Sequence, residues 1–571
     1  MLVLIKKTAR FCRDLPAGLG LFVMSSLVCP IFLYHHVLSG WWRFDDPHLI
    51  RLIMTSSTYE FFVEPQVWQS LSLANFTPWL VFSLYVDQQL SPDLRPVFFY
   101  MHQLLMVMGV SVLSYIFLRQ WRSDYWAALG TIIFVSGVPV LVIVNQLMTR
   151  HYLEGLFFFI LSLLFFQRAV RQNKILFSIL GALVYLLAMS AKEIYVMLAV
   201  AAFFWPEGSL RQRLKLVFPY MAALLSFVLW RGYMLGWQMG GYGSLIEYQG
   251  LTGITKIPVL SAGALVGEGL LSSAVLVLTG LIIFIYASRS LKTGVFALAS
   301  IPALFLPLVP VVNLMSGPSR FFILIWWSLS MAACMAFSAR VNKVRVLSWV
   351  KTGLALLLLG TVIFNAMHYR PVLENSVKRF EVVGRFIWDL DGKNDFVFAP
   401  ELFGEAGYLS GVVWLKKHKG HGEGPEAVFA DMVELYDFKE RQGVEAGTVW
   451  RYSRSVGEVK DITNQLPELI YPWLEGFRKE DLRISLRLIK DMLHWEFGPY
   501  QKGEYHFIVR HDHDVSASMR LPSSGYVRTV KQTSEDSLFF RIRYNSLEGW
   551  WTYSPWLEYV PTDDPLLLWE R

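Results

Sequence analysis

The sequence predicts a polytopic α-helical membrane domain of about eleven transmembrane helices, followed by a soluble α+β domain. Of its 571 residues, 54% are hydrophobic and 15% aromatic, and the mean hydropathy is +0.40. Apolar segments of about 17–25 residues, long enough to cross the hydrocarbon core, recur up to about residue 370. Residues 1–370 carry a net charge of +14 and residues 371–571 a net charge of −7. We therefore assign residues 1–370 to a membrane domain and residues 371–571 to a soluble domain.

Eleven segments are apolar enough to be membrane spans. Basic residues precede the first one, but no convincing cleavage site follows, so we expect it to be retained as a span. The sixth is short and the eighth is long. The predicted spans cover approximately residues 17–38, 96–118, 126–147, 153–168, 175–191, 194–206, 214–235, 258–287, 294–315, 321–339 and 352–369.

Basic residues in the short loops predict the orientation of these spans. With eleven spans, every Lys/Arg cluster falls on one side, which we take as the cytoplasm. The N-terminus is then cytoplasmic, while the first long loop (39–95) and residues 371–571 lie outside, periplasmic if the membrane is the bacterial inner (plasma) membrane. The pI near 9.0 reflects the cytoplasmic loops and does not indicate nucleic-acid binding. Ten of the thirteen acidic residues in the membrane part avoid the cytoplasmic side, so we expect the chemistry at the outer face.

Asp45 and Asp46 follow the first span directly. Two neighbouring carboxylates can share acid–base work, because repulsion and partial burial raise the pKa of one of them. One carboxylate could then remove the proton of an attacking hydroxyl. The alternative is a helix cap, since Asp46-Pro47 is a favourable start for a helix lying on the membrane. Both interpretations hold together if Asp45 reacts and Asp46 caps.

The turn between the third and fourth spans, residues 148–154, is rich in polar side chains. Arg150 or His151 could bind a phosphate there, with Glu154 as a second acid. The alternative is a polar turn in which Arg150 and Glu154 pair at helical spacing.

Two further outer turns carry cations. Lys192 could neutralise a lipid-linked phosphate, with Glu193 orienting it, or it could extend to the membrane interface as an anchor. Arg320 opens the tenth span, where the helix N-terminus also favours anions, and arginine recognises phosphate in a bidentate manner. The alternative role of Arg320 is also interface anchoring.

The soluble part offers weaker candidates. His511, Asp512, His513 and Asp514 resemble a metal cluster, but the alternating pattern before them favours a solvated strand end, and we predict no metal site. Helices are expected near residues 426–439 and 481–494, and strands near 504–510, 525–531 and 537–544. The chain has no phosphate-binding glycine loop and no dinucleotide fingerprint, so nucleotide-driven chemistry is unsupported.

These motifs resemble the GT-C glycosyltransferases. The likeness rests on the Asp45-Asp46 pair after the first span, the outer loop with interfacial helices, and Arg95-Pro96 entering the second span. It is strongest for the branch that holds the protein O-mannosyltransferases and the aminoarabinose transferase of lipid A. The turn at Lys192-Glu193 looks like the Lys-Glu turn of the transmembrane-and-TPR O-mannosyltransferases, and Ser319-Arg320 resembles a late arginine of that family.

The resemblance implies inverting transfer of a hexosyl or pentosyl group from a polyprenyl-phosphate donor, such as an undecaprenyl phosphate, to a hydroxyl of an extracytoplasmic glycan, lipid or protein. It implies Asp45 as the general base with Asp46 beside it, and Lys192 and Arg320, with Arg150, on the donor phosphate. It implies no cofactor, with the lipid-linked sugar as donor substrate and metal not required. The C-terminal residues show no TPR pattern, which argues against protein mannosylation as the specific activity.

Three other functions compete with this interpretation. An O-antigen polymerase or ligase would use a pyrophosphate donor. A transporter or flippase of a lipid-linked substrate would have internal repeats and broken helices with charges at the midplane. A non-catalytic anchor for the soluble domain would leave the polar outer turns unexplained.

Overall fold

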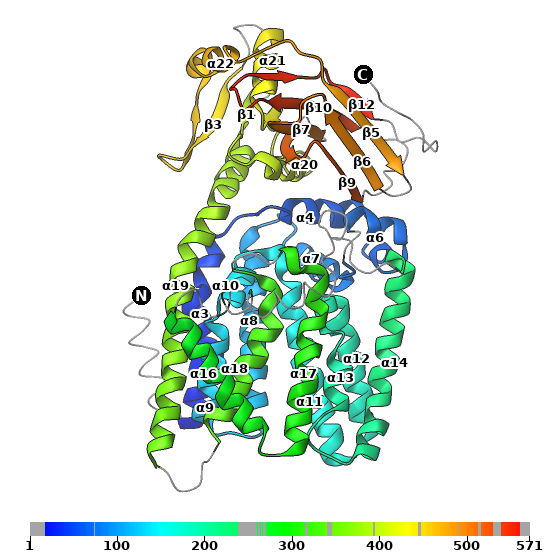
Figure 1. Cartoon of the computed structure of the whole chain (residues 1–571), viewed down its shortest axis with the longest axis vertical. Coiled ribbons are helices and arrows are strands. Elements are labelled where there is room, and N and C mark those ends of the chain that lie inside the picture. The colour runs from blue at the N-terminus through cyan, green and yellow to red at the C-terminus, as the bar shows by residue number, and fades with distance from the viewer. Residues whose placement is uncertain are drawn as a thin grey trace.

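The protein consists of two parts stacked along its long axis. The computed structural model describes residues 17–72, 75–237, 260, 263, 265, 270–314, 318–339, 345–391, 394–442, 447–489, 492–511, 515–528 and 538–559. A bundle of long helices forms one part, and sheets with short helices form the other (Figure 1). This arrangement confirms the predicted fold class, a polytopic helical membrane domain with a C-terminal domain of helices and strands.

Helices occur at all eleven predicted spans. Within the described residues, seven helices are long and apolar enough to cross a membrane singly, and an eighth span consists of two helices bent by 58°. Three shorter apolar helices correspond to the fifth, sixth and eighth predicted spans. Residues 258–259 and most of 261–269, where the eighth span was expected to begin, lie outside the described residues. The span helices are Ala17–Ser39, α8 (Pro96–Arg119), α9 (Asp124–Val135), α10 (Val138–Val144), α11 (His151–Gln172), α12 (Ile175–Ala191), α13 (Leu198–Phe203), α14 (Leu210–Leu235), α16 (Leu270–Ala287), α17 (Leu291–Phe305), α18 (Ile323–Phe337) and α19 (Arg345–Asp389).

The bend in the third span has a local cause. It falls at Gly137, between α9 and α10, where a Cβ atom would lie 1.9 Å from the indole nitrogen of Trp326. That nitrogen donates a hydrogen bond to the carbonyl of Phe134, at 2.8 Å. The indole therefore occupies the space opened by the break and satisfies a carbonyl near the end of α9.

The first outer loop folds into short helices that cover one end of the bundle (Figure 1). They are α4 (Asp46–Thr55), α5 (Glu60–Val63), α6 (Pro65–Leu71) and α7 (Pro78–Leu90). The apolar face of α4 buries Leu49, Ile50 and Ile53, as expected of an amphipathic surface helix. The sequence predicted one or two interfacial helices in this loop, and the structure has four.

The two parts are connected by α19. This 45-residue helix contains the last predicted span and continues past residue 370 to Asp389, along one side of the molecule (Figure 1). Its C-terminal end is held by Lys416, whose Nζ donates to the carbonyls of Ile387 (3.1 Å), Trp388 (2.9 Å) and Leu390. A buried ammonium thus satisfies three carbonyls that the helix itself leaves unpaired.

The C-terminal domain is built on a mixed nine-stranded sheet, in the order β11-β10-β7-β8-β2-β1-β3-β4, with β12 also paired to β10. The strands β8, β2, β1 and β3 run parallel, and helices α20 and α21 connect β1, β2 and β3 as crossovers. A separate antiparallel sheet contains β5, β6 and β9. The bounds are β1 (Phe396–Phe398), η8 (Phe403–Tyr408), α20 (Leu409–His418), β2 (Ala427–Phe429), α21 (Met432–Gln442), β3 (Val449–Ser453), β4 (Glu458–Asp461), α22 (Leu466–Leu474), β5 (Arg483–Ile489), β6 (Met492–Gly498), β7 (Glu504–His511), β8 (Val515–Leu521), β9 (Ser524–Arg528), β10 (Leu538–Asn545), β11 (Trp551–Tyr553) and β12 (Leu557–Tyr559).

One predicted element of this domain is wrong. Residues 481–494 were expected to form a helix, but they contribute to the hairpin of β5 and β6. The side chains of Leu482, Ile484 and Leu486 are buried, whereas Arg483 and Arg487 are exposed. This near-alternation with a period of two is typical of a strand. The three predicted strands are present as β7, β9 and β10, although residues 529–531 and 537 of the predicted ranges lie outside the described residues. The helix predicted near residues 426–439 is present only in its second part, as α21, because residues 427–429 form strand β2.

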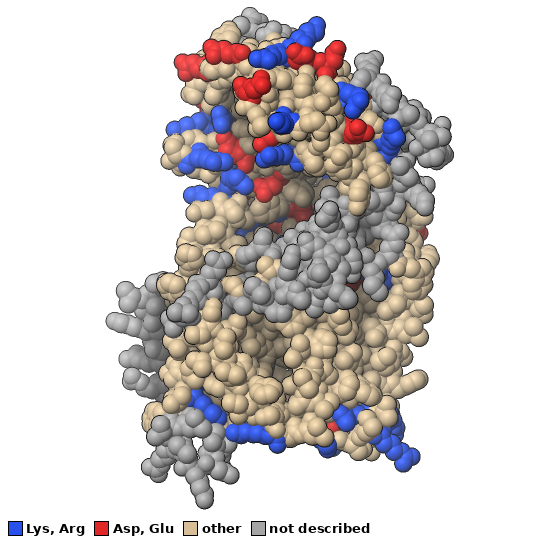
Figure 2. Space-filling model, viewed as in Figure 1, with Lys and Arg blue, Asp and Glu red and all other residues tan. Residues whose placement is uncertain are grey.

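Charge divides the surface along the long axis. In Figure 2, Lys and Arg side chains gather at the end of the bundle far from the C-terminal domain, and an almost uncharged band covers the middle. Charges of both signs reappear on the C-terminal domain. This distribution is that of an integral membrane protein with its basic loops on one side.

Candidate active site

Asp45 and Asp46 lie at the start of α4, between the helical bundle and the C-terminal domain. Asp45 is the residue at the N-cap position but makes no capping hydrogen bond with its side chain. Asp46 is the first residue of the helix, and Pro47 follows it. The two carboxylates therefore point to different surroundings although they are adjacent in sequence.

Asp46 has a structural role. Its two carboxylate oxygens accept hydrogen bonds from the backbone nitrogens of Arg43 and Met148, each at 2.9 Å. The side chain is 3% exposed, and burial raises its pKa to about 7 in spite of these two bonds. Asp46 thus joins the first outer loop to the turn before α11. The prediction that Asp46 caps the helix is wrong, because Asp45 occupies the N-cap position and Asp46 is already the first helical residue.

Asp45 is the more accessible of the two. Burial raises its pKa, while a hydrogen bond from Tyr408 and the positive charge of Arg320 act in the opposite direction. A carboxylate whose pKa is raised by burial, and whose ionised form is favoured by two neighbouring groups, is suited to accept a proton near neutral pH. The site therefore combines residues from α4, from the turn before α18 and from the C-terminal domain.

Arg320 begins η7 (Arg320–Phe322), directly before α18. Its side chain hydrogen-bonds the Tyr152 hydroxyl and lies 3.5 Å from Oε1 of Gln146. Within the described part of the chain, Arg320 forms no ion pair with a carboxylate. The hydrogen-bond partners of Arg320 are neutral, and its positive charge interacts with Asp45 only through space. The guanidinium can therefore bind an anion from solution.

Tyr152 connects Arg320 to Lys192. The ammonium of Lys192 lies 4.9 Å from the centre of the Tyr152 ring and donates to Oδ1 of Asn75, at 3.1 Å. His151 stacks beside the same ring, at 4.7 Å between centroids, and lies in the field of both Lys192 and Arg320. Two cations and a histidine thus converge at one place, and of these two cations Arg320 is the one whose charge acts on Asp45.

Glu193, the neighbour of Lys192, bonds two other parts of the membrane domain. Its Oε1 accepts from the backbone nitrogen of Phe76 at 3.0 Å and from Nε of Arg231 at 2.8 Å. It therefore joins the first outer loop to α14. Its carboxylate does not orient the Lys192 ammonium through any bond that the structure gives it.

Arg150 and Glu154 lie elsewhere. Arg150 is fully buried, with its guanidinium paired to Asp87 and bonded to the carbonyl of Phe99 at 3.0 Å. Glu154 accepts from Ser83, which also bonds Arg150. These residues fasten α7 to the bundle, and the structure does not bring them to the Asp45 site.

Two contributors to the site could not be assigned from the sequence. Tyr152 stands in the polar turn that was singled out, but only its neighbours were assigned roles. Tyr408 lies more than 350 residues from Asp45, and nothing in its own segment marks it. The cluster at residues 511–514, where the sequence analysis predicts no metal site, lies outside the described residues apart from His511. No group of three or more His, Cys, Asp or Glu side chains suited to a metal occurs in the described part.

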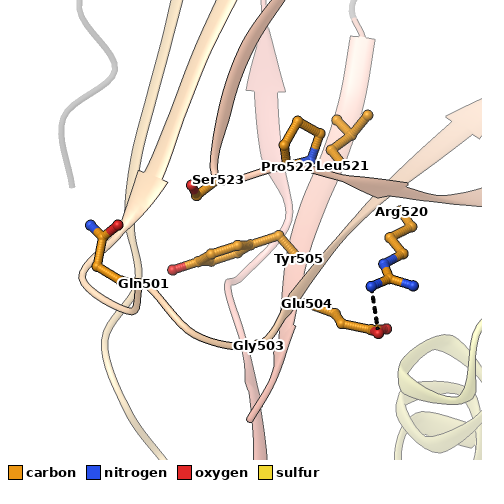
Figure 3. Close-up of a pocket in the computed structure, with 8 residues that line it drawn as sticks. All are labelled: Gln501, Gly503, Glu504, Tyr505, Arg520, Leu521, Pro522 and Ser523. Atoms are coloured by element: carbon orange, nitrogen blue, oxygen red, sulfur yellow. Dashed lines mark ion pairs between the residues drawn. The ribbon is translucent and has the colours of Figure 1, made fainter. Parts of the chain in front are cut away.

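The C-terminal domain has a cavity of its own, of about 410 Å³. Figure 3 shows the carboxylate of Glu504 and the guanidinium of Arg520 paired at its edge, at 2.7 Å. Gln501, Tyr505 and Ser523 also contribute to the lining. None of the residues discussed above for the Asp45 site belongs to this cavity.

Comparison with known proteins gives only distant structural likeness. No protein-family model matches the chain, and no curated protein matches it in sequence. Solved structures similar to it include the oligosaccharyltransferase of Archaeoglobus fulgidus without ligand, with a TM-score of 0.45 and 11% identity over 69% of this chain and 63% of that one. This chain thus spans less than two thirds of that enzyme.

Two further structures of the same archaeal enzyme are also similar. The oligosaccharyltransferase AglB in complex with an inhibitory peptide and a dolichol-phosphate has a TM-score of 0.43 and 10% identity, over 88% of this chain and 74% of that one. The enzyme tethered to an acceptor peptide has a TM-score of 0.41 and 12% identity, over 85% and 74%. At such values the likeness by itself assigns neither a family nor an activity to this chain.

Proposed function

We propose that this protein is a glycosyltransferase of the GT-C type. It would transfer a sugar from a polyprenyl-phosphate donor to a hydroxyl group of an extracytoplasmic glycan, lipid or protein. Asp45 would act as the general base, and Lys192 and Arg320, with His151 beside them, would bind the donor phosphate. The observation that carries this proposal is the convergence of these cations around Tyr152, with the positive charge of Arg320 acting on Asp45.

The chemistry follows from that placement. Asp45 takes the proton of the acceptor hydroxyl while the hydroxyl oxygen forms a bond to the anomeric carbon of the sugar. The bond from that carbon to the phosphate oxygen breaks, and the electron pair leaves with the polyprenyl phosphate. Lys192 and Arg320 stabilise the negative charge that develops on the departing phosphate. A single displacement of this kind inverts the anomeric configuration.

The site also lies where a lipid-linked donor would be presented. It is at the end of the bundle opposite to the basic cluster, below the C-terminal domain (Figures 1 and 2). By the charge rule this end is extracytoplasmic, and the C-terminal domain would lie on the same side. Because the lysine and arginine supply the positive charge, the proposed reaction requires no metal ion and no cofactor, and it involves no nucleic acid.

The transporter alternative has one observation in its favour, the broken third span. However, the break at Gly137 is filled by the apolar indole of Trp326, and Ser136 beside it carries no charge. We therefore interpret the break as a packing feature. A polymerase or ligase would use the same base with a pyrophosphate donor, so the donor requirement in the next experiment distinguishes the two.

The proposal is tested in three variants of the full chain in lipid nanodiscs. Asp45→Asn should abolish transfer from polyprenyl-phosphate sugars, while the affinity for undecaprenyl phosphate stays unchanged. Lys192→Ala and Arg320→Ala should each weaken binding of undecaprenyl phosphate at least tenfold, since each removes a charge-assisted contact.

A matched control is Arg370→Ala, which removes a half-exposed arginine paired with Glu374 on α19. Its binding and transfer should equal those of the wild type. Wild-type transfer by Asp45→Asn would refute the assignment of the base. Activity with pyrophosphate donors alone would favour the polymerase or ligase. We expect transfer by the wild type to continue when divalent metals are chelated.

A further inference from the structure

The C-terminal domain packs so closely on the first outer loop that only a glycine fits at the point of contact. Gly411 lies in α20, against the start of α4. A Cβ atom at this position would lie 2.8 Å from the backbone nitrogen of His48 and 2.9 Å from the carbonyl carbon of Pro47. The backbones of α20 and α4 are therefore in direct contact, two residues from Asp45.

Further contacts fix this arrangement from several sides. Arg43 pairs with Glu381 of α19 at 3.2 Å, and the rings of Phe44 and Phe380 are 5.6 Å apart. The Arg51 guanidinium lies 5.7 Å from the Trp414 ring. Residues on both sides of Asp45 are thus held by α19 and α20, so the C-terminal domain cannot move without moving the start of α4.

The segment before α20 then reaches Asp45 itself. It is η8, which begins at Phe403 in the left-handed region (φ 47°) and ends at Tyr408, immediately before α20. Phe403 packs edge-on to the His506 ring, at 5.6 Å, so η8 rests on the central sheet. From that support the Tyr408 hydroxyl donates a hydrogen bond to the Asp45 carboxylate.

We propose that Tyr408 is a positioning residue for Asp45, so that the C-terminal domain completes the active site of the membrane domain. The inference rests on the proposed function, since it assigns a partner to the proposed base. The hydroxyl orients the carboxylate and favours its ionised form. Among the described residues, the other charged groups that act on or with Asp45 are Arg320, from the turn before α18, and Asp46, from α4 itself.

The Tyr408–Asp45 link can be measured without substrate. A carbodiimide with an amine nucleophile modifies carboxyl groups in their protonated form, and peptide mass spectrometry of the full chain gives the labelling of Asp45 as a function of pH. Tyr408→Phe removes a donor to the ionised form, so the midpoint should rise. We expect a rise of about 0.5–1 pH unit, because the tyrosine is 37% exposed and water replaces part of the lost bond.

A second test variant and a control variant accompany this measurement. Gly411→Ala should produce a rise in the same direction, since its methyl group pushes α20 away from α4. Tyr526→Phe, which changes an exposed tyrosine of β9, should leave the midpoint at the wild-type value. An unchanged midpoint in Tyr408→Phe would overturn the inference, and so would an equal rise in Tyr526→Phe.

The consequence for catalysis is tested separately. In the transfer assay, the acidic limb of the pH profile of kcat/KM should move upward in Tyr408→Phe by the same amount as the labelling midpoint, because only ionised Asp45 accepts the proton. A merely structural role would lower kcat/KM at all pH values without moving the limb. If wild-type protein transfers no sugar while the labelling midpoint shifts, the proposed function fails although Tyr408 contacts Asp45. If the wild type transfers sugar, and neither the labelling midpoint nor the acidic limb moves in Tyr408→Phe, the inference fails and the proposed function stands.

Discussion

Glu434 offers a sharp test of how the C-terminal domain is stabilised. It lies on α21, is 4% exposed, and is bonded to Ser516 of β8. Burial raises its pKa from 4.5 to about 8, and the charge of Asp431 adds to this rise. The folded domain therefore prefers the protonated acid, whereas the unfolded chain ionises near pH 4.5. The stability that Glu434 contributes is fully present below pH 4.5 and is lost as the pH rises through 8.

The size of the effect follows from the difference in pKa. Each pKa unit corresponds to about 1.4 kcal/mol. At pH 6 the raised pKa of Glu434 lowers the stability of the folded domain by about 2 kcal/mol, and at pH 9, above both pKa values, by about 5 kcal/mol. Glu434→Gln keeps the shape and can exchange a hydrogen bond with Ser516 in either direction, but it has no proton to lose. The variant should therefore be more stable than the wild type, by about 3 kcal/mol more at pH 9 than at pH 6.

The assay is urea unfolding of the full chain in detergent, followed by a brief pulse of subtilisin at each pH. The survival of the C-terminal domain gives its midpoint of unfolding. Glu458→Gln, at an exposed position of β4, is the matched control and should shift the midpoint equally at both pH values. A gain for Glu434→Gln that does not grow between pH 6 and pH 9 would refute the reasoning.

Three other variants test the scaffold. Lys416→Met leaves three buried carbonyls at the end of α19 without a donor, so the same assay should show a loss of about 3 kcal/mol or more. Gly137→Ala should prevent accumulation of folded protein, because its methyl group would overlap the Trp326 indole, and Gly137→Ala with Trp326→Ala should recover part of the yield, as size-exclusion profiles would show. Arg150→Met should lower thermal stability by about 3 kcal/mol, because it removes the arginine of a buried ion pair and leaves His102 as the remaining charged contact that the structure gives the Asp87 carboxylate. Adding Asp87→Leu should restore most of that loss, and binding of undecaprenyl phosphate by the double variant should match the wild type; weaker binding would instead support the phosphate role first expected of Arg150.

The spans could be predicted from the sequence because one effect dominates them. A segment of about 20 apolar residues has no favourable place other than the bilayer, whatever the rest of the chain does. The hairpin of β5 and β6 shows the opposite case. The alternation of buried and exposed residues in β5 is blurred by Ser485, which is buried as well. Only the pairing between the two strands decides the structure there.

The site was predictable in part. The sequence singled out Lys192 and Arg320, because a cation at the outer face contradicts the charge pattern of the other loops, and the structure brings both side chains next to Tyr152. It could not separate Arg150 from His151. Adjacent residues on a helix point about 100° apart, so one side chain turns towards Asp87 and the other towards Tyr152. Which direction each one takes depends on helices that lie far away in sequence.

The length of α19 limits which insertions and deletions in this helix the molecule tolerates. At about 1.5 Å per residue its 45 residues extend for roughly 68 Å, against about 30 Å for the hydrocarbon core. Residues 370–389, which follow the predicted span, thus form a rod of roughly 30 Å outside the bilayer that sets both the height and the rotation of the domain on top of it. Deleting one residue in the outer half would lower the domain by only about 1.5 Å but would turn it by about 100°. Evolution can lengthen this rod only in steps close to whole turns, because intermediate lengths would present a different face of the domain to the bundle.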